Sequence, residues 1–285
     1  MTVAIAAACR DKGDPFQPRI VIGFDSKIST SLHSSETAFK IEDLAPSPFA
    51  AMFAGNISGG RELIDIYRTY LAEHYPRDNT PSLSDIQEQL RQPLWLRKRR
   101  MTDAFVQRRL GMSYEEFCGH KEWVDTSLWI SMFNEINSIT LDAVLLLVGF
   151  RKDHLHPCML FTTAWDDVGS HLNFACIGDG AAAAEFSLHA RAQYEHMDVI
   201  RTLYHVYEAK RASETAPTVG KAFVLGVAVP SALEHYEINF VSKAMKDQLK
   251  SWYGELGPKK VTELEVPDGL DMFEPLNRDV FREPS

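Results

Sequence analysis

Met1-Thr2-Val3-Ala4-Ile5-Ala6-Ala7-Ala8-Cys9 opens the chain, and the rest of the sequence is interpreted outward from it. The small apolar run after Thr2 predicts a buried strand over residues 3–8. If Met1 is removed, Thr2 bears both a hydroxyl and a free α-amine, and such amines have an ordinary pKa of about 7.7–8.0. One residue then supplies a nucleophile together with its own base. The stretch therefore predicts a catalytic threonine, provided that the rest of the chain builds a site around it.

The composition is typical of a soluble globular protein. The chain has 285 residues, of which 45% are hydrophobic and 24% charged, which suits one large domain or two small ones with an ample core. The formal net charge of −9 disfavours nucleic acid as the main partner, because phosphate binding requires a basic surface. No apolar run approaches the length of a membrane span, and residues 1–8 lack the basic start of a signal peptide. We expect no membrane partner and a cytoplasmic location.

The cysteine and histidine spacings indicate neither a metal site nor a disulfide framework. The four cysteines are scattered without CxxC spacing, and Cys9 and Cys176 lie in apolar runs, where we expect them to be buried. His154 and His156 flank a leucine in a polar turn without a companion carboxylate cluster. Gly178-Asp179-Gly180 lacks the lysine and the spacing of a nucleotide-binding loop. We therefore expect no bound metal and no cofactor.

The order of predicted elements separates strands from helices. Apolar runs predict strands over residues 3–8, 19–25, 39–41, 49–54, 141–150, 158–163, 173–177, 223–229 and 235–240. Helical spacing predicts helices over 61–75, from about 82 past 90, 181–196 and 197–214. This pattern favours an α+β protein with two antiparallel sheets, which begin with a hairpin of residues 3–8 and 19–25, and with pairs of helices outside.

The same order of predicted strands and helices indicates the domain organisation. We expect a single domain over 1–245, interrupted by a helical insertion at about 76–138, and a C-terminal extension over 246–285. The tail after Lys250 is rich in Pro, Gly, Asp and Glu, which predicts an extended or partly disordered segment. Within the insertion, the basic run Arg97–Arg100 is interpreted as a solvated helix face or as a contact to an acidic neighbouring subunit.

Six stretches, in this order, resemble the proteasome β-subunit family of N-terminal-nucleophile hydrolases, including the simpler bacterial ring proteases. They are Thr2-Val3-Ala4-Ile5-Ala6, Ile20-Val21-Ile22-Gly23-Phe24-Asp25-Ser26, Phe39-Lys40-Ile41, Phe53-Ala54-Gly55, Leu145-Leu146-Leu147-Val148-Gly149-Phe150 and Ala175-Cys176-Ile177-Gly178-Asp179-Gly180. The resemblance implies a four-layer αββα sandwich. It also implies a threonine peptidase in a self-associated ring that acts on peptides or unfolded proteins, with any ATP-dependent unfoldase as a separate partner.

The resemblance assigns roles to four residues. Thr2 is similar to the family's nucleophile and Asp25 to the carboxylate that ends the second strand. Lys40, fifteen residues further on, is similar to the family's lysine, and Gly55, fifteen beyond that, to the glycine whose N–H stabilises the oxyanion. Simpler interpretations of the last three remain open: a strand-end turn residue, an edge-strand lysine and a tight-turn glycine.

Four features depart from the family pattern. Asp179 occupies the position of a serine that supports the N-terminal amine, and an aspartate there favours the ammonium form or replaces the serine in positioning it. The later acid-and-serine pair has no clear counterpart, although Glu214, Thr215 and Thr218 lie nearby. No propeptide with a glycine precedes Thr2, so activation needs removal of Met1 by an aminopeptidase. The 76–138 insertion is foreign to the minimal family pattern.

Three functions stay open at this point. The first is a threonine-type amide hydrolase, a peptidase in a ring. The second is a catalytically inactive structural or interaction protein that keeps the fold and an assembly interface. The third is an amidohydrolase for small non-peptide amides. Labelling by a threonine-directed covalent probe separates the second from the other two, and turnover of small amides separates the third from the first.

Overall fold

The structure is a computed structural model. It describes residues 3–14, 16–25, 28–29, 34–35, 41–75, 81–120, 122, 124–151, 156–164, 167–231, 236–257, 267 and 269–274. The predicted α+β class is confirmed, because two antiparallel sheets and several helices make up this part of the chain.

The first sheet holds the opening stretch at its centre. In the described residues its order is β10 (Phe174–Gly178), β1 (Val3–Arg10), β2 (Pro18–Asp25), β11 (Phe223–Pro230), β12 (Tyr236–Val241) and β13 (Phe273–Glu274). The predicted hairpin of β1 and β2 is confirmed, with Ile5 paired to Gly23. Every residue from Val3 to Cys9 is 0% exposed. Such a strand is buried on both faces, which explains its unbroken apolar run.

The second sheet faces the first. The order of its described strands is β5 (Ile41–Asp43), β6 (Phe49–Gly55), β7 (Ala143–Phe150), β8 (Cys158–Ala164) and β9 (Asp167–His171). The predicted pairing of the 141–150 and 158–163 runs is confirmed, with Leu147 opposite Phe161. A separate two-stranded ribbon consists of β3 (Ile28–Ser29) and β4 (Ser34–Ser35).

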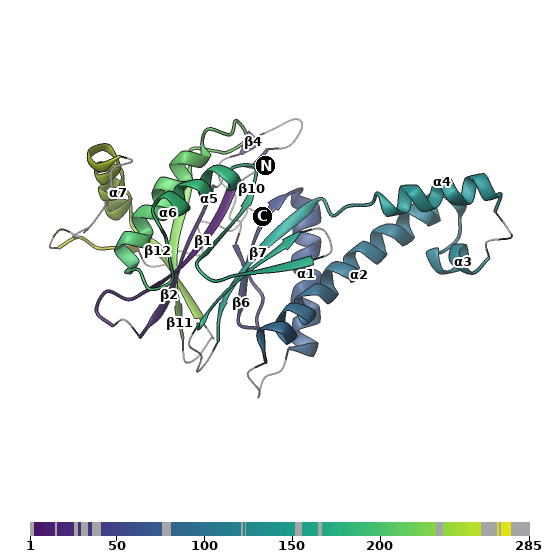
Figure 1. The fold of residues 1–285 in the computed structure, drawn as a ribbon, viewed down its shortest axis with the longest axis horizontal. Helices are drawn as coiled ribbons and strands as arrows, with labels where there is room; N and C mark the ends of the chain where they lie inside the picture. Colours follow the sequence, from purple (N-terminus) through teal and green to yellow (C-terminus); the bar gives the residue numbers. More distant parts are fainter. Residues whose placement is uncertain are drawn as a thin grey trace, which may run out of the picture.

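Helices cover the outer faces of both sheets (Figure 1). The helices of the described residues are, in chain order, α1 (Ile57–His74), α2 (Leu83–Leu110), α3 (Tyr114–Gly119), α4 (Thr126–Asn137), α5 (Ala181–Ala190), α6 (Val199–Ser213) and α7 (Lys243–Leu256). Of these, α3 and α4 lie away from the sheets (Figure 1). None of these helices is both long and apolar enough to cross a membrane, in the part of the chain that the structure describes.

Three buried clusters hold the layers together. One joins the first sheet to α5, α6 and α7, and includes Ile5, Leu203 and Leu249. The second fills the space between the two sheets with small side chains such as Ala4 and Ala54. The third joins the second sheet to α1 and α2. Alternate residues of β1 enter different clusters because successive strand side chains point to opposite faces.

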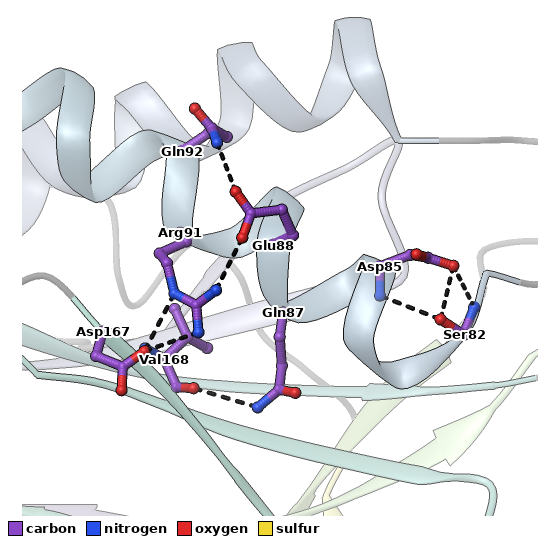
Figure 2. A network of polar contacts seen from close by, with 8 residues as sticks. All are labelled: Ser82, Asp85, Gln87, Glu88, Arg91, Gln92, Asp167 and Val168. Atoms are coloured by element: carbon purple, nitrogen blue, oxygen red, sulfur yellow. Dashed lines mark hydrogen bonds and ion pairs between the residues drawn. The ribbon is translucent and has the colours of Figure 1, made fainter.

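The first turns of α2 are joined to β9 by hydrogen bonds and an ion pair (Figure 2). Arg91 reaches Asp167 Oδ1 through Nε at 3.1 Å and through Nη2 at 2.9 Å, and Gln87 Nε2 donates to the Val168 carbonyl at 3.2 Å. A capping box at Ser82 starts the helix. These contacts fix the direction in which α2 leaves the sheet.

The distal part of α2 forms a helical arm with α3 and α4 that projects away from the sheets (Figure 1). The arm has its own small cluster of buried residues: Val106, Phe117, Met132 and Ile136. It occupies the stretch in which the sequence predicts a helical insertion. Part of the basic run is paired within the chain, since Arg97 Nη1 lies 2.7 Å from Glu62 Oε1.

Two features of the fold differ from the sequence expectation. β9 was not predicted, because its residues Asp-Val-Gly-Ser-His lack a run of β-branched or aromatic side chains. The expectation of an extended tail after Lys250 is wrong for residues 251–256, which continue α7. Burial of Leu249 and Trp252 against the first sheet stabilises this helix despite its polar composition.

Candidate active site

A buried carboxylate lies where β1 begins and β2 ends. Asp25, the last residue of β2, is 0% exposed. Its Oδ1 accepts the Val3 N–H at 3.3 Å and its Oδ2 accepts the Gly220 N–H at 2.9 Å. Each carboxylate oxygen accepts a backbone hydrogen bond, as a buried acceptor requires. Asp25 thus joins the start of β1 to the loop between α6 and β11.

A second carboxylate belongs to the same region. Val3 pairs with Gly178, the last residue of β10, and Asp179 follows directly. Asp179 Oδ2 accepts the Thr218 hydroxyl at 2.5 Å. Thr218 lies in the same loop as Gly220, so this one loop contacts both carboxylates. Of the residues that the sequence left loosely assigned, Thr218 enters the site.

The turn that carries Asp179 packs tightly against that loop. A Cβ added at Gly180 would lie 2.7 Å from Ser213 Cβ and 3.0 Å from Val219 Cγ2. The first distance is too short for a real side chain and the second is tight, so a glycine suits this close approach. The Asp179 turn is therefore packed closely against the end of α6 and the loop that follows it.

A buried lysine that sequence reasoning missed lies under the loop. Lys210 is 0% exposed, and its Nζ donates to Glu214 Oε1 at 2.7 Å and to the Gly220 carbonyl at 2.8 Å. Burial lowers the pKa of Lys210, and the negative charges of Glu214 and Asp25 partly oppose this shift. In the sequence, the i,i+4 spacing of Lys210 and Glu214 indicates an ion pair. This spacing is also usual for pairs on an exposed helix surface, so it does not indicate burial.

Gly55 ends β6 on the opposing sheet. Its φ is +108°, and a Cβ there would lie 2.4 Å from the Asp142 carbonyl oxygen. Both facts exclude any other residue without local rearrangement. Ala54, the preceding residue, shares the inter-sheet cluster with Ala4. The tight-turn interpretation of Gly55 is thus sufficient to explain the glycine, and its oxyanion role stays a prediction.

Thr2 and Lys40 lie outside the described residues. The structure therefore brings together Asp25, Asp179 and the N–H of Val3, which follows Thr2 in the sequence. It adds Lys210 and Thr218 to this set.

Groups elsewhere are less suited to chemistry. The predicted burial of Cys9 and Cys176 is confirmed, and burial raises the pKa of both thiols well above its ordinary value, which makes them poor nucleophiles. His156 Nδ1 lies 2.5 Å from Glu195 Oε1, whereas His154 is outside the described residues. The described ranges contain no group of three or more His, Cys, Asp or Glu residues arranged to hold a metal ion.

The arrangement offers a fixed carboxylate, a buried lysine and a closely packed loop at the first described residue of a central strand. Such a constellation can orient a nucleophile or an amine at that strand end. No protein-family model and no curated protein matches this chain.

Proposed function

We propose that this protein is a threonine-type N-terminal-nucleophile hydrolase that cleaves amide bonds, with the αββα fold of the proteasome β-subunit family. The observation that carries the proposal is the hydrogen bond from the Val3 N–H to the buried Asp25 carboxylate. Thr2 precedes Val3 in the sequence, so this bond brings a fixed carboxylate within one residue of the proposed nucleophile.

The proposed chemistry has two steps. After removal of Met1, the Thr2 oxygen attacks the substrate carbonyl carbon while its proton passes to the Thr2 amine, directly or through a water. The C–N bond breaks, and the proton is delivered to the leaving amine. Water then hydrolyses the Thr2 ester and regenerates the hydroxyl. Lys40, paired with Asp25, would stabilise the developing charge on the Thr2 oxygen, and the Gly55 N–H would bind the oxyanion.

Asp179 bears on whether the Thr2 amine can act as a base. A carboxylate close to an amine favours its protonated form, which cannot act as a base. One Asp179 oxygen accepts the Thr218 hydroxyl, so this oxygen has less capacity to accept a further hydrogen bond from an amine. We therefore propose an active enzyme whose rate increases towards higher pH as the amine loses its proton.

The carboxylate at position 179 also favours a second candidate, a catalytically inactive protein that keeps the same fold. In either case we propose a homo-oligomeric ring. The active form would act on peptides or unfolded proteins, supplied by a separate unfoldase if one is used. Turnover of small amides alone would instead support an amidohydrolase.

A covalent threonine-directed inhibitor tests the proposal. Purified protein is incubated with the inhibitor, and its intact mass is compared with that of Thr2→Ala and of the matched control Thr215→Ala. Thr215 Oγ1 donates to the Ala212 carbonyl at the end of α6, so this threonine has a local structural role. We expect one adduct on the native protein and on Thr215→Ala, and none on Thr2→Ala. Labelling of Thr2→Ala would remove Thr2 from the mechanism.

A further inference from the structure

We propose that Lys210 is a positioning residue for the site: its buried ammonium holds the loop of residues 214–220 in the conformation that bonds Asp25 and Asp179. This inference rests on the proposed function for its catalytic consequence. The structural part, that Lys210 holds the loop, stands on the contacts alone.

The ion pair between Lys210 and Glu214 is buried. The side chain of Lys210 is 1% exposed and that of Glu214 is 14% exposed. A Lys–Glu pair at i,i+4 on a helix surface contributes little, and the transfer of an ammonium from water into a protein core is unfavourable. The free-energy cost of burying the Lys210 ammonium must therefore be offset by hydrogen bonds. Glu214 and the Gly220 carbonyl accept these bonds.

Gly220 links Lys210 to Asp25. Its carbonyl accepts from Lys210 Nζ at 2.8 Å, and its N–H donates to Asp25 Oδ2 at 2.9 Å. The position of one glycine is thus determined by an ammonium on one side and a carboxylate on the other. Loss of the ammonium would release the carbonyl and let the N–H move away from Asp25.

The end of α6 also packs against the turn that carries Asp179, through Ser213. Ser213 Oγ donates to the Lys210 carbonyl at 2.6 Å, and Ser213 Cβ is the atom closest to a Cβ placed on Gly180. The last turn of α6 therefore packs on the turn that carries Asp179, and the loop that follows contacts both carboxylates. Two charged side chains of this turn reach the loop: Lys210 and Arg211 both pair with Glu214, and Lys210 alone of the two also bonds the Gly220 carbonyl in the described contacts.

The test separates positioning from general stability. Lys210→Met removes the ammonium at similar length, and the double variant Lys210→Met/Glu214→Leu removes both charges, in case the single variant does not fold. Leu249→Ala is the control, since Leu249 lies on α7 in the buried cluster to which α6 also contributes, and has no part in the proposed site. Amide hydrogen exchange is measured for Gly220 and Val3, relative to the amides of β11.

We expect the Lys210 variants to lose at least tenfold protection at Gly220 and Val3, and Leu249→Ala to keep the native ratio. Native ratios in both Lys210 variants would overturn the inference. Covalent labelling supplies the catalytic readout: we expect the maximal labelling rate to fall at least tenfold at unchanged inhibitor affinity, with partial rescue by Lys210→Arg. If the native protein is not labelled at all, the proposed function fails, and the exchange result still decides whether Lys210 holds the loop.

Discussion

Replacement of Asp25 by asparagine examines the hydrogen bonds on which the site depends. Both carboxylate oxygens accept a backbone N–H, from Val3 and from Gly220. In Asp25→Asn, one of these oxygens becomes an NH₂ group that faces another donor. The variant loses one bond to a charged group, worth about 1.5–3 kcal/mol, and leaves a buried N–H without its acceptor, which costs about 1–3 kcal/mol. Allowing for local relaxation, we expect the free energy of unfolding to fall by about 2–4 kcal/mol.

Equilibrium urea unfolding measures this change as a lower midpoint at an unchanged slope. Asp14→Asn is the matched control, because Asp14 Oδ1 also accepts a backbone N–H, from Phe16 at 2.9 Å, but in an exposed turn. The control should lose less than about 1 kcal/mol. If Asp25→Asn loses no more than Asp14→Asn, the claim that Asp25 is a buried bridge between β1 and the 214–220 loop is refuted.

Three further substitutions follow from the same geometry. Gly180→Ala should destabilise the protein by about 1–3 kcal/mol, since its Cβ would lie 2.7 Å from Ser213 Cβ at the end of α6, whereas Gly254→Ala, with nothing within 4 Å in a helix, should be neutral or stabilising by thermal unfolding. Gly55→Ala should cost about 2–5 kcal/mol in urea, because strain at φ +108° adds to a backbone clash, and Gly111→Ala, at φ +70° in open space, only about 1 kcal/mol; equal losses would contradict the clash. Burial lowers the pKa of His205 from 6.5 to about 3, so the folded protein binds fewer protons than the unfolded chain in that window. Stability should therefore fall by about 3 kcal/mol from pH 7 to pH 4, and His205→Asn should reduce this slope; an unchanged slope would show that other groups cause it.

The strands were the most predictable part of the fold. Leu141–Phe150 was predicted as a strand and β7 covers Ala143–Phe150, because a continuous apolar run between polar turns suits a strand buried on both faces. α7 was only partly predictable. Its buried residues Met245, Leu249 and Trp252 follow helical spacing, but the helix is stabilised by tertiary contacts that its polar composition does not indicate.

The candidate site was predictable in part. Asp25, which ends a predicted strand, and Asp179, which follows one, were identified through the resemblance to the proteasome β-subunit family. The Thr218 contact was not, since it joins residues 39 apart in sequence. Lys210 and Glu214 have the spacing of an ordinary surface pair, and only the packing of α6 on the first sheet buries them. A local pattern does not reveal which face of a helix becomes the core when both faces carry polar residues.

The intact mass of the purified protein, before and after incubation with a threonine-directed covalent inhibitor, tests the central claim most directly. The account predicts loss of Met1 and a single stoichiometric adduct that maps to Thr2 and is absent from Thr2→Ala. Retention of Met1 with no adduct, at any pH at which the protein is folded, would contradict it and would indicate a protein that keeps this fold without the chemistry.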